Sequence, residues 1–581
     1  MARAGKSMIP QKAKQKEVFP ELKPLYGVMN DGKMVRLCGP IAVGREFANI
    51  DLKERGLEIN HRSVLGTPAT TILFRRDLSA CRKVAGILAA SGVDVSHKAP
   101  AQEELCRVLA AIKPEHIVLH APREGLHEIP EGEQPTLVWT TGDRTYGRLV
   151  TSELEVELEP NALKITSTKG DIEQWNREVV GQARGNNMLV FALCLPFAAP
   201  LLSLCRLPGF IVAFWEETTS GKSTLLRGAQ SVFRDPTDLA TWKGTESGFG
   251  AYAAAHTDHA LILDNLDWPE VKNLPDVVYS LTNQAGKLRA KQDGRLATHA
   301  FARIIAITAA EKNPVDLAQK ATGSLTDGFL VRFLPIRVRR KYRAFDDIHG
   351  AEDGGAFAKK VVSAACTNYG WPWRKFIKYL MTHISEVKEE VLTANSRIAR
   401  KLVEMVDSGD ATALVPRVAE HFALIYRAGR IAAKAGALAL TKTELREAVV
   451  DAFRTWHQGF RDNYARIGED PVAFVRRAVK DIPSAKIVPL NDWKKHTPDT
   501  VIAYRHRLNG ENVLLVHKRA FDKLFTGRHA RKRVVAALRT ANILIIDSRD
   551  SGTKQFRMPK SNDRERFFTL RLDDLKANSS A

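Results

Sequence analysis

The chain has 581 residues, more than one hydrophobic core usually spans, so three or four domains are expected. Its hydrophobic fraction of 44% is ordinary for a globular protein and excludes extensive disorder. Lys and Arg outnumber Asp and Glu by 87 to 66, a formal net charge of +21 that predicts a polyanionic partner, either nucleic acid or an anionic membrane surface. The alternative is a basic protein whose charge only keeps it soluble.

The amino-terminal residues 1–32 begin with the basic stretch MARAGKSMIPQKAKQK, which lacks the apolar run of a signal peptide, so we expect a flexible basic arm. The cysteines are scattered without any C-x-x-C pair, which excludes a zinc ribbon and disfavours a disulfide framework. A reducing, cytoplasmic setting is therefore expected. The six cysteines are Cys38, Cys81, Cys106, Cys194, Cys205 and Cys366.

Residues 33–165 mix short alternating strands with helices. MVRLCGPIAV and TTILF are expected to be strands, and SACRKVAGILAASGV an amphipathic helix that closes at Gly92. This stretch contains no evident catalytic cluster, so it is predicted to be an α+β accessory domain.

The uncharged segment MLVFALCLPFAAPLLSLC, residues 188–205, approaches the length of a membrane span. Pro196 and Pro200 interrupt it, Arg206 and Pro208 end it, and a strand follows directly. We therefore expect a buried helix or helix pair behind a sheet, and no membrane partner.

Residues 166–345 alternate apolar strands with helices. The expected strands are GFIVAFW, HALILDNLDW, FARIIAITAAE and GFLVRFLPIRV, and the expected helices include STLLRGAQSVF and PDVVYSLTN. This alternation predicts an open, mainly parallel α/β sheet, with a loop after its first strand.

That loop, within FWEETTSGKSTLL, matches the second half of the phosphate-binding pattern G-x-x-x-x-G-K-[ST]. Gly221 would let the backbone approach a phosphate, Lys222 would supply charge, and Ser223 would offer a hydroxyl to Mg²⁺. Glu216 stands where the pattern has its first glycine, and a carboxylate there should point away from the phosphates or weaken binding. The predicted nucleotide contacts of the loop are Thr219, Ser220, Gly221, Lys222, Ser223 and Thr224.

About 40 residues later, the strand LILD ends in Asp264, which is predicted to bind magnesium together with Ser223, although a strand-end residue facing solvent is the alternative. The next residue in such sites is normally a glutamate that activates water, but here it is Asn265. An amide cannot accept the proton. Asp267 could substitute for the base, or Asn265 could keep a water-orienting role.

The segment GKLRAKQDGR, residues 286–295, carries four cations around a Q-D-G turn. Alternation along a hairpin arm would place three of them on one face. We predict a loop that contacts a phosphodiester backbone, with a solvated charged hairpin as the alternative. The four cations are Lys287, Arg289, Lys291 and Arg295.

Two polar residues at apolar strands complete the central candidates. Thr308 ends the strand IIAIT and could sense a terminal phosphate, whereas Arg332 lies at an apolar strand edge. Arg332 could form a local salt bridge or reach a neighbouring subunit's nucleotide as an arginine finger. The run IRVRRKYR beyond it is expected to form a basic surface.

Residues 346–465 are expected to be helical, with RVAEHFALIYRAGRIAAKAGAL the clearest helix. In residues 466–581, HARKRVVAALRTANILIIDSRDSGTKQFRM is predicted to run helix, strand, turn, strand, the order of a winged helix and of many small α+β domains. Its basic residues are expected to contact DNA, with a basic helix face that has no ligand as the alternative. They are Arg528, Arg531, Lys532, Arg533, Arg549 and Lys554.

The stretch from Gly170 to Arg343 resembles a bacterial domain family of unknown function carried by phages, plasmids and genomic islands. This family includes the self-loading replication helicase of staphylococcal chromosomal cassettes, which is related to the MCM branch of AAA+ ATPases. The matching landmarks are GDIEQWNREV, GNNMLVFALCLPFAAPLL, TTSGKSTLLRGAQSVF, TWKGTESGFGAYAAAHTDHALILDN, VVYSLTNQAGKLRAK and GFLVRFLPI.

The resemblance implies a multidomain α/β protein with an AAA+ P-loop ATPase core, an N-terminal α+β domain, a helical region carrying a second sensor, and a C-terminal winged helix. It implies Walker A roles for Lys222 and Ser223, a Walker B role for Asp264, a phosphate-sensor role for Thr308 and a trans-finger role for Arg332. It implies that Lys287 to Arg295 is a channel hairpin and that Arg417 is the second sensor. A hexameric ring using ATP and Mg²⁺ is implied, with element-encoded replication partners possible.

Three functions are compatible with these patterns. The first is an ATP-dependent DNA helicase or translocase of a mobile element, acting on single-stranded or forked DNA. The second is an ATP- and DNA-binding initiator or scaffold with little hydrolysis, because of Glu216 and Asn265. The third is a nucleotide-dependent sensor in a defence or regulatory system.

Overall fold

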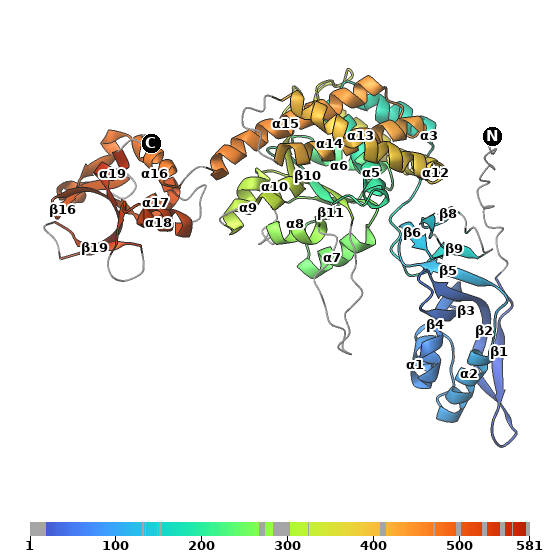
Figure 1. Cartoon of the computed structure of the whole chain (residues 1–581). Helices are drawn as coiled ribbons and strands as arrows, with labels where there is room; N and C mark the ends of the chain where they lie inside the picture. Colours follow the sequence, from blue (N-terminus) through green and yellow to red (C-terminus); the bar gives the residue numbers. More distant parts are fainter. Residues whose placement is uncertain are drawn as a thin grey trace.

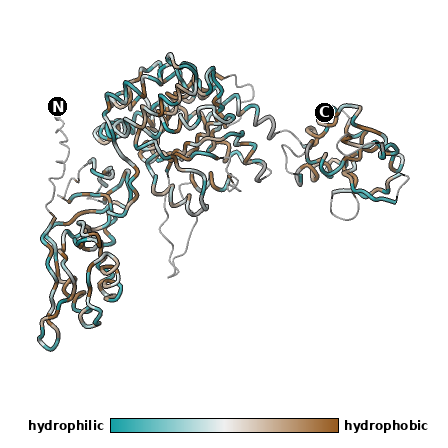
Figure 2. The backbone as a smooth tube through the Cα atoms, turned by 180° about the vertical axis from the view of Figure 1, so that it is seen from behind, coloured by the Kyte–Doolittle hydropathy of each residue, from teal (hydrophilic) through white to brown (hydrophobic). Residues whose placement is uncertain are grey.

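The computed structural model describes residues 19–130, 133, 135–147, 149, 154–266, 274–282, 303–322, 325–406, 414–468, 471–495, 501–525, 531–546, 552–559 and 562–576. Figure 1 shows an amino-terminal unit, a larger central unit and a carboxyl-terminal unit in a row. Hydrophobic stretches occur in all three (Figure 2), and each unit contains buried hydrophobic clusters. The expectation of a multidomain α/β chain is confirmed.

The amino-terminal unit is a sheet in the order β4-β3-β2-β5-β9, with β1 paired to the first half of β2 and two helices packed on the sheet. The sheet begins with β1, inside the stretch that the sequence assigned to a flexible arm, because β1 pairs along its length with β2. Its elements are β1 (Lys23–Val28), β2 (Met34–Asn49), β3 (Arg55–Arg62), β4 (Pro68–Phe74), the 3-10 turn Arg75–Ser79, α1 (Cys81–Ala90), α2 (Ala99–Ala111), β5 (Ile117–Ala121) and β9 (Glu155–Leu158).

A small antiparallel sheet, β6 (Gly125–Ile129), β7 (Thr136–Thr140) and β8 (Thr145–Tyr146), lies between this unit and the central one. Trp139 of β7 is fully buried in the central core, with its ring centroid 6.0 Å from that of Trp373. The amino-terminal region therefore packs onto the central unit through an aromatic side chain.

The central sheet has five parallel strands in the order β11-β12-β13-β10-β14, as the sequence pattern predicted. All their carboxyl ends lie at one edge, where ligands of open α/β sheets bind. The strands are β10 (Phe210–Trp215), β11 (Ala240–Thr241), β12 (Ala260–Asp264), β13 (Ile305–Ala310) and β14 (Phe333–Arg337). The helices are α3 (Ile172–Trp175), α4 (Gly181–Ala183), α5 (Asn187–Leu204), α6 (Lys222–Ser231), α7 (Glu246–Ala255), α8 (Leu274–Thr282), α9 (Pro314–Thr322) and α10 (Asp327–Arg332), with a π-helical turn at Asn176–Val180.

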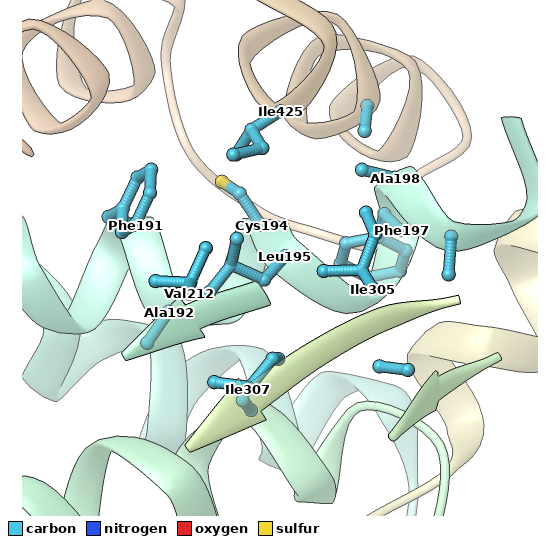
Figure 3. Close-up of a cluster of buried hydrophobic side chains, with 14 of the residues drawn as sticks. Phe191, Ala192, Cys194, Leu195, Phe197, Ala198, Val212, Ile305, Ile307 and Ile425 are labelled. Atoms are coloured by element: carbon cyan, nitrogen blue, oxygen red, sulfur yellow. The ribbon is translucent and has the colours of Figure 1, made fainter. Parts of the chain in front are cut away.

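The uncharged segment forms one continuous helix, α5, which includes both Pro196 and Pro200. By length and composition α5 is the one helix in the described part of the chain that could cross a membrane, and 89% of its apolar window is buried. Figure 3 shows its side chains between the sheet strands and the helix that carries Ile425. α5 is thus the core helix behind the sheet, one of the two arrangements expected.

The predicted strand GFLVRFLPIRV is wrong in its first half, because Asp327–Arg332 forms α10 and only Phe333–Arg337 is strand. Thr326 starts the helix, since its side-chain oxygen accepts a hydrogen bond from the backbone N–H of Phe329 at 3.2 Å. Such an N-cap favours a helix over an extended chain.

The helical region consists of α11 (Gly354–Thr367), α12 (Trp371–Thr382), α13 (Ile384–Glu404), α14 (Leu414–Lys434) and α15 (Lys442–Gly468). α14 and α15 pack on α5, and one buried cluster runs from Trp139 to Phe460. The sheet and the helices therefore share a core, with no break at residue 345.

The carboxyl-terminal unit has a sheet in the order β15-β16-β17-β20-β18, and β19 also pairs with β20. The predicted helix and two strands are present as α18, β18 and β19, and in the described part of this unit each of the two strands pairs with β20. The elements are α16 (Pro471–Lys480), β15 (Ile487–Pro489), β16 (Ala503–Leu508), β17 (Glu511–His517), α17 (Lys518–Phe525), α18 (Arg531–Thr540), β18 (Leu544–Ile545), β19 (Lys554–Arg557), β20 (Arg564–Arg571) and α19 (Leu572–Lys576), with 3-10 turns at Ser484–Lys486 and Leu490–Lys495.

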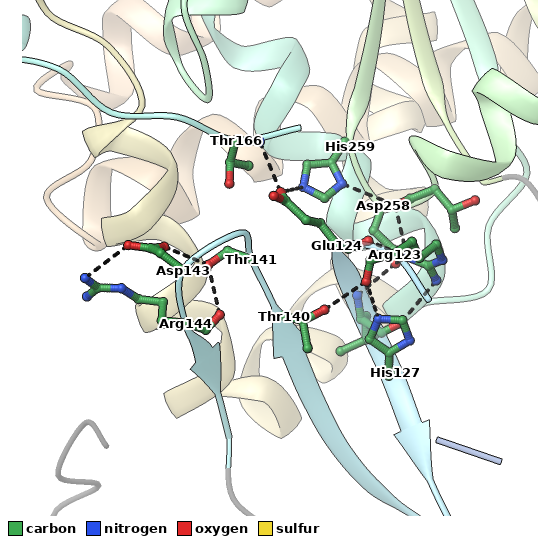
Figure 4. Close-up of polar contacts among 12 residues, drawn as sticks. Arg123, Glu124, His127, Thr140, Thr141, Asp143, Arg144, Thr166, Asp258 and His259 are labelled. Atoms are coloured by element: carbon green, nitrogen blue, oxygen red, sulfur yellow. Dashed lines mark hydrogen bonds and ion pairs between the residues drawn. The ribbon is translucent and has the colours of Figure 1, made fainter. Parts of the chain in front are cut away.

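A buried polar network joins the β5–β6 connection to the residues just before β12 (Figure 4). Arg123 Nη1 donates to Asp258 Oδ2 at 2.7 Å, and the Asp258 side chain is fully buried. His259 Nε2 lies 3.7 Å from Glu124 Oε2, which accepts a hydrogen bond from the Thr166 backbone N–H at 3.1 Å. Burial raises the pKa of Glu124 to about 7 against the effect of its hydrogen-bond donors, and burial lowers the pKa of His259 to about 3.

The substitution Glu124→Gln is expected to change how stability depends on pH. Because the Glu124 pKa rises on folding from 4.5 to about 7, its stabilising contribution is complete below pH 4.5 and is lost as the pH rises through 7. The variant lacks this loss. The difference in thermal midpoint between the variant and the wild type should therefore shift by several degrees in favour of the variant as the pH rises from 5 to 8. Parallel profiles across this range would show that Glu124 does not titrate there.

Candidate nucleotide site and basic surfaces

The loop between β10 and α6 has the backbone shape of a phosphate-binding site. Gly221 has φ +91° and precedes α6 directly, and a Cβ there would lie 3.1 Å from the Cβ of Ala344, so only glycine fits without strain. No side chain caps α6, so its first N–H groups remain directed at the loop, where an anion would satisfy them.

The Lys222 ammonium lies inside this loop. Its Nζ donates to the backbone oxygens of Glu216 at 2.6 Å and Glu217 at 2.9 Å, and to Ser220 Oγ at 3.0 Å. The side chain is 8% exposed. Lys222 therefore holds the loop closed on itself, and phosphate oxygens would offer the same ammonium charged acceptors in place of neutral ones.

Ser223 and Asp264 meet across the loop, although 41 residues separate them in sequence. Ser223 Oγ donates to Asp264 Oδ2 at 2.9 Å, because α6 begins beside the carboxyl end of β12. No group of three or more His, Cys, Asp or Glu side chains suited to a metal ion occurs in the described ranges. One hydroxyl and one carboxylate are nevertheless enough for Mg²⁺, which keeps several waters and takes phosphate oxygens as ligands.

The carboxylate of Glu216, which stands in place of the first glycine of the loop pattern, is explained by Arg337. Arg337 was not singled out in the sequence. Trp215 and Arg337 are register partners at the ends of β10 and β14, and Arg337 Nε donates to Glu216 Oε2 at 2.9 Å. The guanidinium also lies 5.1 Å from the centre of the Trp215 ring. Burial raises the pKa of Glu216, but the hydrogen bonds from Arg337 and from the Glu217 N–H outweigh it and lower the pKa. The carboxylate is thus ionised and held toward β14.

The substitution Arg337→Ala is expected to weaken ATP binding about two- to fivefold, because the released Glu216 carboxylate would repel the phosphates beside it. The effect is small since the Arg337 side chain is 46% exposed and the charges are screened. Titration with a fluorescent ATP analogue measures it. The double variant Glu216→Gln/Arg337→Ala should bind like the wild type; equal weakening in both variants would contradict the charge explanation.

Asn265 lies at the same edge of the sheet, exposed and with φ +62°. Its backbone N–H donates to Asp264 Oδ1 at 2.8 Å, so the chain turns sharply after β12. Asp267, the proposed substitute base, lies outside the described residues. Glu311 was not predicted, yet it follows β13 and accepts a hydrogen bond from Thr218 Oγ1 of the loop at 2.8 Å. The sequence signal that could have found it is its place as the first charged residue after that strand.

Thr308 lies inside its strand and not at the strand end that the sequence suggested. β13 continues for two residues beyond it, Thr308 is fully buried, and its Oγ1 accepts a hydrogen bond from Trp242 Nε1 at 2.7 Å. The alanines that follow Thr308 extend the strand to the sheet edge. The structure thus corrects the position of Thr308, which ties Trp242 to the sheet, and its phosphate-sensor role stays a prediction.

Arg332 lies in the last turn of α10, which corrects the prediction of a strand edge. Its Nη1 donates to the Gly328 backbone oxygen at 2.9 Å, and its guanidinium carbon is 5.5 Å from the centre of the Tyr279 ring. α10 leads into the amino end of β14, so Arg332 lies at the edge of the sheet opposite to the loop.

Arg417 is exposed on the first turn of α14. Arg417 and Arg332 both lie near the same residue, His421. Burial, together with the positive charges of both arginines, lowers the pKa of His421 to about 4. His421 stacks on Phe210, the first residue of β10, with ring centroids 4.3 Å apart. Since β10 spans about 17 Å along its axis, the arginine pair cannot reach the loop of its own chain.

Only some of the residues predicted to contact DNA lie in the described part of the chain. Arg531 Nε donates to Asp522 Oδ1 at 2.6 Å, an ion pair between α18 and α17, and its contact with DNA stays a prediction. Lys554 begins β19. Lys532 and Arg533 belong to α18, but their side chains lie outside the described part of the chain. The predicted contacts that lie outside it entirely are Lys287, Arg289, Lys291, Arg295, Arg528 and Arg549.

Known proteins resemble this chain in sequence and in fold. The family described as "Domain of unknown function (DUF927)" matches residues 25–300. The search of curated proteins found no match. The solved structure titled "SCCmec type IV Cch - active helicase" superposes with a TM-score of 0.60 at 15% identity, covering 97% of this chain and 100% of that chain. The chain thus contains a match to this domain of unknown function and shares its fold, over nearly its whole length, with that solved structure.

Proposed function

We propose that this protein is an ATP-dependent DNA helicase or translocase of a mobile genetic element, active in replication of that element. The observation that carries the proposal is the contact between Ser223 and Asp264, beside a lysine-bearing loop at the carboxyl edge of a parallel sheet. The shared fold with a structure titled as an active helicase supports it. We assign the core to the MCM-like branch of AAA+ ATPases that the sequence resembles.

In this proposal, ATP phosphates bind at the amino terminus of α6. Lys222 exchanges its backbone acceptors for phosphate oxygens, and the loop N–H groups satisfy the remaining charge. Ser223 and Asp264 would hold Mg²⁺, which would supply positive charge against the phosphates during transfer of the terminal phosphoryl group.

The two arginines at the opposite edge support a ring of subunits. Arg332 and Arg417 lie together by the amino ends of the strands, too far from the loop of their own chain. In a head-to-tail ring, this edge of one subunit can face the loop edge of the next, and both arginines could then contact the neighbour's ATP. A closed hexamer is the assembly we propose.

The carboxyl-terminal unit is proposed as a winged-helix DNA-binding domain. Helices α16, α17 and α18 pack on one another, and β17, β20 and β18 form neighbouring strands. With Arg531 paired to Asp522, the contacts to DNA fall to the other basic residues of α18 and β19. The net charge of +21 favours phosphate contacts, so binding should weaken steeply with salt.

The proposal is tested by measuring phosphate release by the purified full chain, with and without single-stranded DNA, together with strand separation on a forked duplex. DNA-stimulated hydrolysis with strand separation is expected. Tight binding of ATP and DNA without turnover would overturn the motor and favour the second candidate. Mass photometry with and without ATP tests the hexamer separately.

The second candidate is an ATP- and DNA-binding initiator or scaffold that does not hydrolyse ATP at a useful rate. The observation that favours it is Asn265, whose side chain cannot accept a proton at the position normally held by a base. If this candidate is right, Asn265→Glu should create hydrolysis where the wild type shows none.

A further inference from the structure

We propose that Glu311 is the general base for ATP hydrolysis in this protein and takes the role that Asn265 cannot perform. The inference rests on the proposed ATPase function and names one catalytic residue within it. In this inference, the acid that normally follows the magnesium-binding aspartate is replaced by an acid at the end of the neighbouring strand, β13.

The position of β13 in the sheet carries the argument. β13 lies between β10, which leads into the loop, and β12, which ends in Asp264. At the carboxyl end of β13, the Ala310 oxygen accepts from the Glu216 N–H at 3.3 Å and the Ala309 oxygen accepts from the Leu266 N–H at 2.9 Å. The residue that follows this end therefore emerges between the phosphate loop and the turn at Asn265.

Glu311 is that residue, and its side chain is directed to the loop. Its Oε1 accepts the hydrogen bond from Thr218 Oγ1 at 2.8 Å, and the side chain is exposed at the edge where the phosphates would lie. Proton transfer needs a carboxylate within reach of the attacking water. The contact with Thr218 holds the Glu311 carboxylate beside the loop, where the phosphates would bind.

Three other described carboxylates lie at this edge of the sheet. Glu216 is paired with Arg337, and Asp264 accepts the Ser223 hydroxyl. Glu217 is exposed on the loop, where its backbone oxygen rather than its side chain meets Lys222. Among the described acids of the site, Glu311 is the one that follows the strand between β10 and β12 and whose side chain contacts the loop.

The proposed step balances without any further reactant. A water oxygen forms a bond to the terminal phosphorus, and the bond from that phosphorus to the bridging oxygen breaks, leaving ADP with the electron pair. Glu311 accepts the proton that the water loses and later releases it to solvent. Water attacks more readily when this proton is removed in the transition state.

The test compares Glu311→Gln with Glu389→Gln in the full chain, since both remove one exposed carboxylate but Glu389 lies on α13, away from the loop. Glu311→Gln is expected to lower kcat by on the order of 10²–10⁴-fold while leaving ATP affinity within about threefold. Nucleotide recovered from the variant after incubation should be ATP, whereas the wild type should hold ADP. Glu389→Gln should keep its kcat within about threefold of the wild type.

A rescue experiment separates the base role from a structural one. Adding Asn265→Glu to Glu311→Gln should restore hydrolysis at least tenfold, because a base returns at its usual position. Hydrolysis by Glu311→Gln at the wild-type rate would overturn the inference and leave the ATPase proposal intact. Absence of hydrolysis in the wild type itself, with ATP bound, would overturn the ATPase proposal first, and nucleotide recovered as ATP from wild type and variant alike would identify that outcome.

Discussion

Lys222→Ala is expected to lower ATP hydrolysis by on the order of 10²–10³-fold, the loss typical when one charged or hydrogen-bonding group that stabilises a transition state is removed. The Lys222 ammonium already lies among three oxygen acceptors of the loop, so it is positioned for the phosphates before they bind. Its removal also takes away the contacts that hold the loop in shape. ATP affinity should therefore fall together with kcat.

Phosphate release and binding of a fluorescent ATP analogue measure the two effects. Lys360→Ala is the matched control, because Lys360 is exposed on α11 and its replacement removes the same charge away from the loop. This control should hydrolyse ATP like the wild type. Unchanged turnover in Lys222→Ala would mean that the loop is not the site of hydrolysis, whatever the fold suggests.

Arg123→Ala is expected to destabilise the protein by about 3–5 kcal/mol, the loss typical when one partner of a buried ion pair is removed. Asp258 is fully buried, and Arg123 Nη1 contacts both its carboxylate and the Thr257 backbone oxygen. Without the guanidinium, the Asp258 carboxylate would keep its charge in the interior, with the Leu126 N–H and the Ser203 side chain left as hydrogen-bond donors.

Urea unfolding followed by tryptophan fluorescence measures this loss. Arg36→Ala is the control, because its pair with Asp94 is exposed on both sides and should contribute less than about 1 kcal/mol. The double variant Arg123→Ala/Asp258→Asn should recover part of the stability, since it removes the buried charge as well. Equal stability of Arg123→Ala and the wild type would show that solvent reaches Asp258.

The local features of the nucleotide loop were readable in the sequence. An apolar strand, a loop containing Gly221, Lys222 and Ser223, and an amphipathic helix follow one another within about 20 residues, and each is set by neighbours in the chain. The parallel sheet was predicted for the same reason, because strand and helix periodicities are local. Asp264 was found by its spacing, and the structure brings it to Ser223.

Residues whose roles depend on strand order were not readable. Glu216 looked anomalous because its partner Arg337 lies 121 residues away, at the end of a neighbouring parallel strand. Thr308 looked like a strand end because two alanines beyond it give no local sign that the strand continues. Arg332 was placed in a strand because the apolar run hid the N-cap at Thr326.

The sequence by itself thus determined the glycine-lysine loop, the strand that ends in Asp264, the buried helix α5 and the basic character of the chain, since these follow from residue types at short spacing. Only the tertiary structure decided which strand ends meet. The placement of β13 between β10 and β12 brought Glu311 to the loop, and the packing of α14 against α10 brought Arg417 toward Arg332. These encounters depend on the burial of apolar faces from distant segments in a common core, which no local pattern encodes.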